Sequence, residues 1–144
     1  MPADASDHGR SAPSLGEFPA ATLRMERVNT ASRQARDFAR TELTDLDDST
    51  LQTVLLVATE LVTNAVLHAE APIDLALVPT PEAVLVSVTD CEPLHPELRP
   101  HDVDRTNGRG IALVSMVSRD WGSKLHDGGK TVWALIERPT QPAP

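Results

Sequence analysis

The sequence lacks the features that mark secreted and membrane-spanning proteins. It has a single cysteine, Cys91, which excludes an internal disulfide. Its N-terminus is polar and has no apolar core of the kind found in signal peptides, and no apolar run approaches the length of a transmembrane helix. These absences predict a cytoplasmic protein that has no membrane partner.

Positive charge is also scarce. The chain has 13 lysine and arginine residues against 21 aspartate and glutamate residues, which gives a formal net charge of −8. Binding to duplex nucleic acid depends on clustered lysine and arginine, so no direct nucleic-acid partner is expected, although a nucleotide needs only a local positive site. Arg33, Arg36 and Arg40 share one side of a predicted helix, which is more typical of a solvated basic face than of a ligand site.

Composition separates one domain from two tails. Residues 1–16 are mostly Ser, Asp, Gly, Pro and Ala with little to bury, and they are predicted to be a disordered tail. Residues 17–138 are predicted to form the domain, and residues 139–144, which begin with a proline, form the second tail. The 144 residues show no internal repeat, and this length is enough for one globular domain with its own core.

Hydrophobic periodicity predicts three helices and five strands in this domain. The expected helices cover residues 31–43, 51–69 and 111–118, and the expected strands cover residues 18–25, 73–78, 83–89, 123–126 and 131–137. Asn29 or Thr30 is the candidate N-cap of the first helix, and Asp48 or Ser49 that of the second. The last strand is apolar on both sides, so both of its faces are expected to be covered. The predicted fold class is α/β (α+β), a two-layer sandwich with helices on one face of a mixed, mostly antiparallel sheet.

The helix predicted at residues 51–69 carries an unusual polar side. It has no glycine or proline and is largely apolar, yet Glu60, Asn64 and His68 follow one another at intervals of four and therefore share one side. An ionised glutamate beside an apolar face usually has a partner or a function. A solvated rim is an equally simple interpretation of this helix alone.

Three further polar features follow along the chain. They are Asp90 at the end of a predicted strand, Gly108-Arg109-Gly110 before a predicted helix, and Gly128-Gly129-Lys130-Thr131 before the last strand. Each has a simple structural interpretation: a turn-forming aspartate, backbone punctuation before a helix, and a hairpin turn. Their order and spacing, taken together with the polar side of the helix, are much more specific.

From about Phe18 to Arg138 the chain resembles the bacterial anti-sigma-factor serine/threonine kinases, which belong to the GHKL ATPase superfamily and have the Bergerat, or histidine-kinase-like ATPase, fold. The segments that carry the resemblance are Glu60-Leu-Val-Thr-Asn64-Ala for the N box, Gly108-Arg109-Gly110-Ile-Ala-Leu-Val for the second glycine box, and Gly129-Lys130-Thr131-Val132-Trp133 for the last box. The adenine box departs from the superfamily pattern Asp-x-Gly-x-Gly, because the chain has Asp90-Cys91-Glu92-Pro93-Leu94 there.

The resemblance implies a site for ATP and Mg²⁺. Asn64 would hold Mg²⁺ through its amide oxygen, a hard ligand, and Glu60 would orient or deprotonate the attacking hydroxyl or water. Asp90 would accept a hydrogen bond from the exocyclic amine of adenine, with support from Thr131.

The glycine boxes and the loop before the second one complete the implied nucleotide site. Backbone N–H groups at Gly108 and Gly110 would approach the phosphates. The loop of residues 92–107 would be the lid, and its His95 and His101 have no third ligand of suitable spacing for a metal. The remaining nucleotide-binding candidates are Arg105 and Arg109, as nearest phosphate contacts, and Ile111, Gly129 and Lys130.

The function implied by the resemblance is that of an anti-sigma regulator. Such a protein sequesters an RNA polymerase sigma factor, phosphorylates a serine or threonine of an antagonist protein, and commonly forms a homodimer. Three alternatives stay open: an ATP-binding regulatory module that gates a partner without transfer, the catalytic domain of a sensor histidine kinase, and an adaptor that binds no nucleotide. Against the second, no helical hairpin with a phospho-accepting histidine is expected before the domain. The third requires the motif order to be a coincidence.

Overall fold

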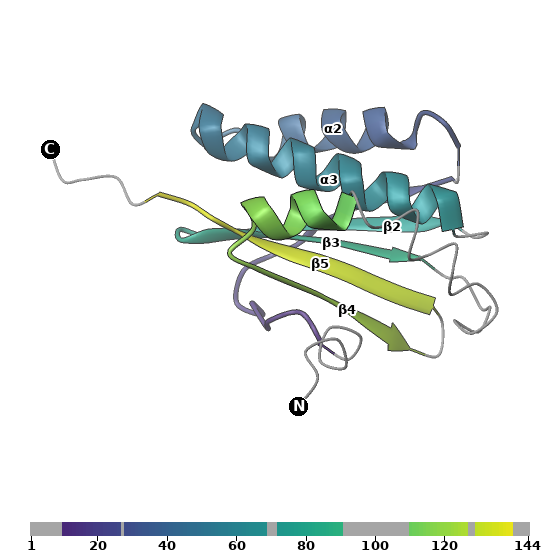
Figure 1. Ribbon diagram of the computed structural model, residues 1–144. Coiled ribbons are helices and arrows are strands. Elements are labelled where there is room, and N and C mark those ends of the chain that lie inside the picture. Colours follow the sequence, from purple (N-terminus) through teal and green to yellow (C-terminus); the bar gives the residue numbers. More distant parts are fainter. Residues whose placement is uncertain (1–9, 27, 69–71, 91–109, 127–128, 140–144) are drawn as a thin grey trace, which may run out of the picture.

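The computed structural model describes residues 10–26, 28–68, 72–90, 110–126 and 129–139 as an α+β domain of two layers (Figure 1). Its elements are β1 (Ala21–Met25), α2 (Ala31–Glu42), α3 (Asp48–His68), β2 (Ile73–Pro79), β3 (Ala83–Asp90), β4 (Asp120–His126) and β5 (Gly129–Glu137). Residues 110–117 are also helical. The three helical segments lie on one face of the sheet, which confirms the predicted architecture.

The five described strands form one sheet in the order β1-β2-β3-β5-β4. Every pairing in it is antiparallel, so the predicted mixed sheet is antiparallel throughout the described strands. β1 pairs only with β2 and is an edge strand, as the proline at position 19 predicts. β4 begins at Asp120, three residues before the predicted start, and forms the other edge.

The main core lies between the sheet and the helices. Ile73, Leu75 and Leu77 of β2 point toward the helices and are fully buried, as the alternation of the sequence predicts. The apolar side of α3 supplies the matching surface with Val54 and Val57, which are also fully buried. Burial of this helix side explains why α3 forms and where it sits.

α3 corrects the expectation that no segment approaches the length of a membrane span. Residues Asp48–Leu67 are long and apolar enough by length and composition, with a mean hydropathy of 1.5 over the best window. However, Ala58, Leu61 and Val62 are buried in the domain core. Length and composition alone are weak evidence for a membrane span, and the core position accounts for the apolar character of this helix.

The N-terminus of α3 is capped by a residue other than those predicted. Asp47, rather than Asp48 or Ser49, accepts a hydrogen bond from the backbone N–H of Thr50 at 3.2 Å. The cap therefore lies one residue earlier, and Asp48 is already in the first helical turn. At α2 the predicted N-cap Thr30 has the cap position but makes no capping bond through its side chain.

Acidification is expected to destabilise the fold through two carboxylates. Hydrogen bonds from the side chain and backbone of Thr50 lower the pKa of Asp47, and the hydrogen bond from Arg24 lowers that of Asp74. Because the folded pKa is the lower one, these contributions are fully present above the ordinary value of 3.8 and are lost as the pH falls through the folded pKa. We expect Asp47→Ala to lower the melting temperature slightly at neutral pH. Asp47→Asn should keep the cap there but lose less stability on acidification, as thermal unfolding followed by circular dichroism would show.

The last seven residues of the predicted disordered tail belong to the domain. Residues 10–16 are placed against the face of the sheet that is opposite to the helices. Within this segment, Arg10 makes hydrogen bonds with both β4 and β5. The prediction of a disordered tail is therefore wrong for residues 10–16. The apolar outer side of β5 is covered by this segment, as the sequence of β5 predicts.

Candidate nucleotide-binding site

The half of α3 that carries Glu60 and Asn64 lies toward the end of the sheet where β3 ends and β5 begins. At the opposite end, Arg138, just after β5, forms an ion pair with Asp45, just before α3, with 3.7 Å between nitrogen and oxygen. α3 therefore starts where β5 finishes and runs toward the end of β3 (Figure 1). This direction carries Glu60 and Asn64 toward the end of the sheet that holds Asp90.

Glu60 lies directly against the second glycine box. A Cβ atom added to Gly110 would be 2.9 Å from Oε1 of Glu60, which is closer than real Cβ contacts. Glycine is therefore required at this position for the carboxylate to approach the backbone. Two segments that are fifty residues apart in sequence, the N box and the glycine box, thus meet at this contact.

Asn64 lies one helical turn after Glu60 and carries an oxygen that suits a metal ion. Its Oδ1 atom is buried and accepts no hydrogen bond within the described part of the chain. A buried acceptor without a partner costs about 1–3 kcal/mol, so such an atom calls for a role. Amide oxygens are hard ligands of the kind that Mg²⁺ prefers, and Asn64 therefore fits the predicted metal role.

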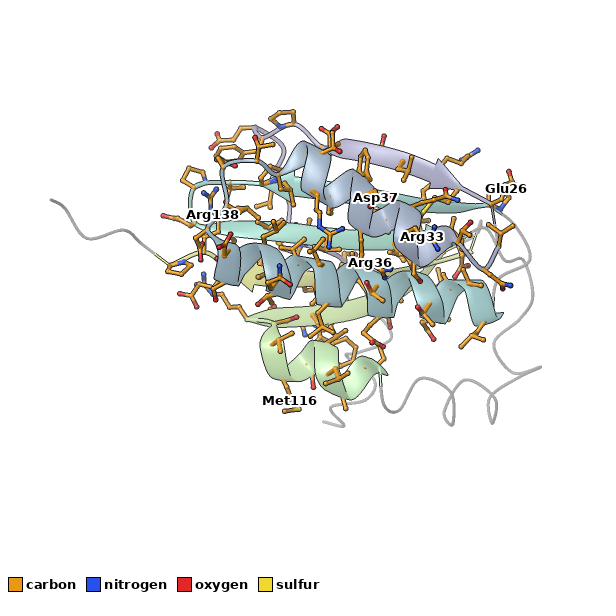
Figure 2. All side chains as sticks on the ribbon, turned by 90° about the horizontal axis from the view of Figure 1, so that it is seen from above. Glu26, Arg33, Arg36, Asp37, Met116 and Arg138 are labelled. Atoms are coloured by element: carbon orange, nitrogen blue, oxygen red, sulfur yellow. The ribbon has the colours of Figure 1, made fainter. Side chains whose placement is uncertain are left out.

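Polar contacts with α2 support this part of α3 from its solvent side. The hydroxyl groups of Ser32 and Thr63 are 2.9 Å apart, and Arg36 donates a hydrogen bond to the Thr59 hydroxyl at 3.2 Å. Figure 2 shows Arg33 and Arg36 along α2, seen from the helix side. Arg36 thus contacts the residue before Glu60, so the predicted solvated basic face is only partly solvated.

The strand register places Lys130, and not Thr131, beside Asp90. Asp90 is buried and pairs directly with Lys130, so the two side chains share the face of the sheet that carries the helices. Thr131 is on the other face, where its hydroxyl lies 2.8 Å from that of Thr89 and 3.2 Å from Nε2 of His126. The predicted support of the adenine contact by Thr131 is therefore not provided by this arrangement.

Several predicted site residues lie outside the described residues. They are Arg105, Gly108 and Arg109, the lid residues 92–107 with His95 and His101, Cys91, and the side chain of His68. Among the described residues, no group of three or more His, Cys, Asp and Glu side chains could hold a metal ion.

A two-layer domain with these boxes, in this order and in contact, is an ATPase domain of the GHKL type. The chain belongs to the histidine kinase-like ATPase domain family, whose model matches residues 21–136. The match runs from the first residue of β1 into β5 and includes Glu60, Asn64, Asp90 and Gly110. A comparison with curated proteins gave no match. Membership of this family indicates that the chain binds ATP.

Proposed function

We propose that the protein is an ATP-dependent serine/threonine kinase and anti-sigma regulator. The observation that carries the kinase role is the contact between the Glu60 carboxylate and Gly110, with the unpaired Asn64 oxygen one turn away. A carboxylate and a metal ligand on one rigid helix can act on the same phosphate group. The sequence resemblance supports the narrower role, in which an RNA polymerase sigma factor and an antagonist protein are the partners and the cytoplasm is the location.

The proposed chemistry assigns one task to each residue. Asn64 would hold Mg²⁺, which when bound neutralises phosphate charge. Glu60 would accept the proton of the serine or threonine hydroxyl as that oxygen attacks the γ-phosphate, while the bond from the γ-phosphorus to the bridging oxygen breaks and ADP leaves. Gly110 keeps the backbone close to Glu60, and Asp90 would select adenine through its exocyclic amine.

A regulatory module that binds ATP without transfer is the second candidate. The family match, which indicates ATP binding, is compatible with such a module. Such a module would gate its partner through its nucleotide state and would leave Glu60 without a catalytic task.

Calorimetric titration of the full-length chain with a non-hydrolysable ATP analogue tests the nucleotide site. We expect binding that requires Mg²⁺ and that is lost when the guanine analogue replaces adenine, because Asp90 is an acceptor for an amine donor. Absence of binding at millimolar ligand would contradict the proposal, and the adenine box would then be the part that fails.

Gly110→Ala is expected to slow phosphate transfer without lowering the stability of the fold. The added methyl group would meet Oε1 of Glu60, the far end of a flexible side chain, so the carboxylate moves while the fold remains. Alanine also favours helix by about 0.5–1 kcal/mol over glycine, so thermal stability should hold or rise. ADP formation should nevertheless fall by about tenfold or more, because a small misplacement of a catalytic group is costly. A variant with unchanged ADP formation would remove Glu60 from the mechanism.

A further inference from the structure

The outer face of the sheet, opposite to the helices, is crossed by residues 10–20, which we name the strap. In Figure 1 the described N-terminal segment passes below the sheet while the helices lie above it. The strap begins beside β4 at one edge of the sheet and leads into β1 at the other edge. The family match covers residues 21–136, so the strap lies outside the matched residues.

Arg10 anchors the strap to the edge strand β4. Its backbone N–H donates to the carbonyl of Ser123 at 3.1 Å, and its Nη1 donates to the carbonyl of Trp121 at 2.7 Å. Its Nη2 lies 2.7 Å from both carboxylate oxygens of Asp120. These bonds use acceptors on a sheet edge that would otherwise be open for pairing.

Trp133 of β5 completes the anchor. The Arg10 guanidinium lies 5.4 Å from the centre of the indole ring, and the indole Nε1–H donates to the Arg10 carbonyl at 3.0 Å. Gly122 makes room for this arrangement, because a Cβ there would lie 2.9 Å from atoms of both Arg10 and Trp133. A side chain at position 122 would therefore meet both the Cβ atom of residue 10 and the indole ring.

The sheet is apolar where the strap lies and polar elsewhere on the same face. The strap residues Ala12, Leu15 and Phe18 pack against a small cluster formed by Val78, Leu85, Trp133 and Leu135. The rest of the face carries the ion pair of Arg24 with Asp74 and the hydroxyl pair of Thr89 with Thr131. The outer face therefore contains one bounded surface for an arginine followed by apolar side chains.

The ion pair that anchors the strap is exposed to solvent. The side chains of Arg10 and Asp120 are 36% and 44% exposed, and ion pairs in such positions contribute little in water. The strap nevertheless stays in place because it is tethered, which gives it an effective concentration on the order of millimolar. A free segment of the same chemistry must overcome that concentration to take its place.

We propose that this surface is a peptide-binding site of the domain and that the strap is its built-in competitor. The occupant that it fits is a segment of a partner protein with an arginine that reaches Asp120 and Trp133, followed by apolar side chains in an extended stretch. Binding of the partner displaces the strap. The site is separate from the ATP site and does not depend on the proposed kinase activity.

The test measures binding of a peptide with the sequence of residues 10–20, acetylated at its N-terminus and carrying a fluorophore at its C-terminus. Fluorescence anisotropy is recorded with the full-length protein as wild type, as Arg10→Glu, and as Arg24→Glu. Arg10→Glu places a carboxylate beside Asp120 and also removes the hydrogen bond to the Trp121 carbonyl and the contact with the Trp133 ring, which together should release the strap. The peptide should therefore bind this variant at least tenfold more tightly than wild type. Arg24→Glu makes the same charge change on the same face, outside the strap contacts, and should behave as wild type.

The site of binding is checked with Gly122→Ala in the Arg10→Glu background, which should abolish peptide binding because the methyl group meets the Cβ atom of the residue in the place of Arg10 and the ring of Trp133. Four results would overturn the proposal: equal affinity of wild type and Arg10→Glu, unchanged binding after Gly122→Ala, unfolding of Arg10→Glu by circular dichroism, and a stable dimer of Arg10→Glu in analytical ultracentrifugation. Unfolding would make the strap a structural member, and a dimer would assign the surface to a second copy of this chain.

Discussion

Replacement of Asn64 by alanine is expected to remove Mg²⁺-dependent ATP binding while the fold remains intact. Mg²⁺ in nucleotide sites uses few protein ligands, so loss of one cannot be made up by the others. Mutating mere supporting groups of metal sites costs about 10–100-fold in affinity, and loss of a direct ligand should cost at least the upper value. Calorimetric titration with the ATP analogue, with and without Mg²⁺, measures this loss.

Thermal unfolding gives the same variant a second readout. The Asn64 oxygen is buried without a partner, so its removal does not break a hydrogen bond between described residues, and stability should be unchanged or slightly raised. Asn64→Asp keeps an oxygen at this position and should retain Mg²⁺ binding. Thr63→Ala, which removes the bond to Ser32 on the neighbouring side of α3, serves as the control and should bind Mg-ATP as wild type. An Asn64→Ala protein that binds Mg-ATP normally would refute the metal assignment.

Much of the fold follows from local periodicity. The apolar positions of β2 and the apolar side of α3 predict which residues face the core, because the periods of strand and helix are fixed by backbone geometry. The Glu60 and Asn64 pair was predictable for the same reason, since a spacing of four places both on one side of a helix. The contact of Glu60 with Gly110 was not predicted, because no local rule joins residues this far apart.

Two features of the structure could not be predicted, the register of β5 against β3 and the packing of the strap on the sheet, because both depend on residues far apart in the sequence. A shift of one residue turns every side chain of a strand to the other face, and the register of β5 is set by its pairing with β3, forty residues earlier. The supporting role of Thr131 came from the resemblance, whereas this register puts Lys130 beside Asp90. The strap was missed because its composition offers little to bury on its own. Trp133 on the outer side of β5 was the available signal, since so large an apolar side chain calls for a cover, which the described N-terminal segment supplies with Ala12, Leu15 and Phe18.

The second large effect is expected for Glu60→Gln, which distinguishes the kinase from the regulatory module. The change keeps the size and the hydrogen-bonding capacity of the side chain but removes the base. Proton transfer by a positioned carboxylate contributes about 10²- to 10⁴-fold, so the rate of ADP formation should fall by that factor. The affinity for the ATP analogue should remain within about twofold, because a group that acts only in the transition state does not contribute to ground-state binding.

The result is informative whichever hydroxyl group accepts the phosphate, because ADP is formed in each case. Glu82→Gln provides the matched control, since Glu82 lies at the β2–β3 turn near Arg138, at the opposite end of the sheet. If Glu60→Gln and Glu82→Gln both form ADP at the wild-type rate, Glu60 is not the base. If the wild-type protein binds Mg-ATP but forms no ADP even with candidate antagonist proteins present, Glu60 does not act as a catalytic base. The domain then acts as the ATP-gated regulatory module.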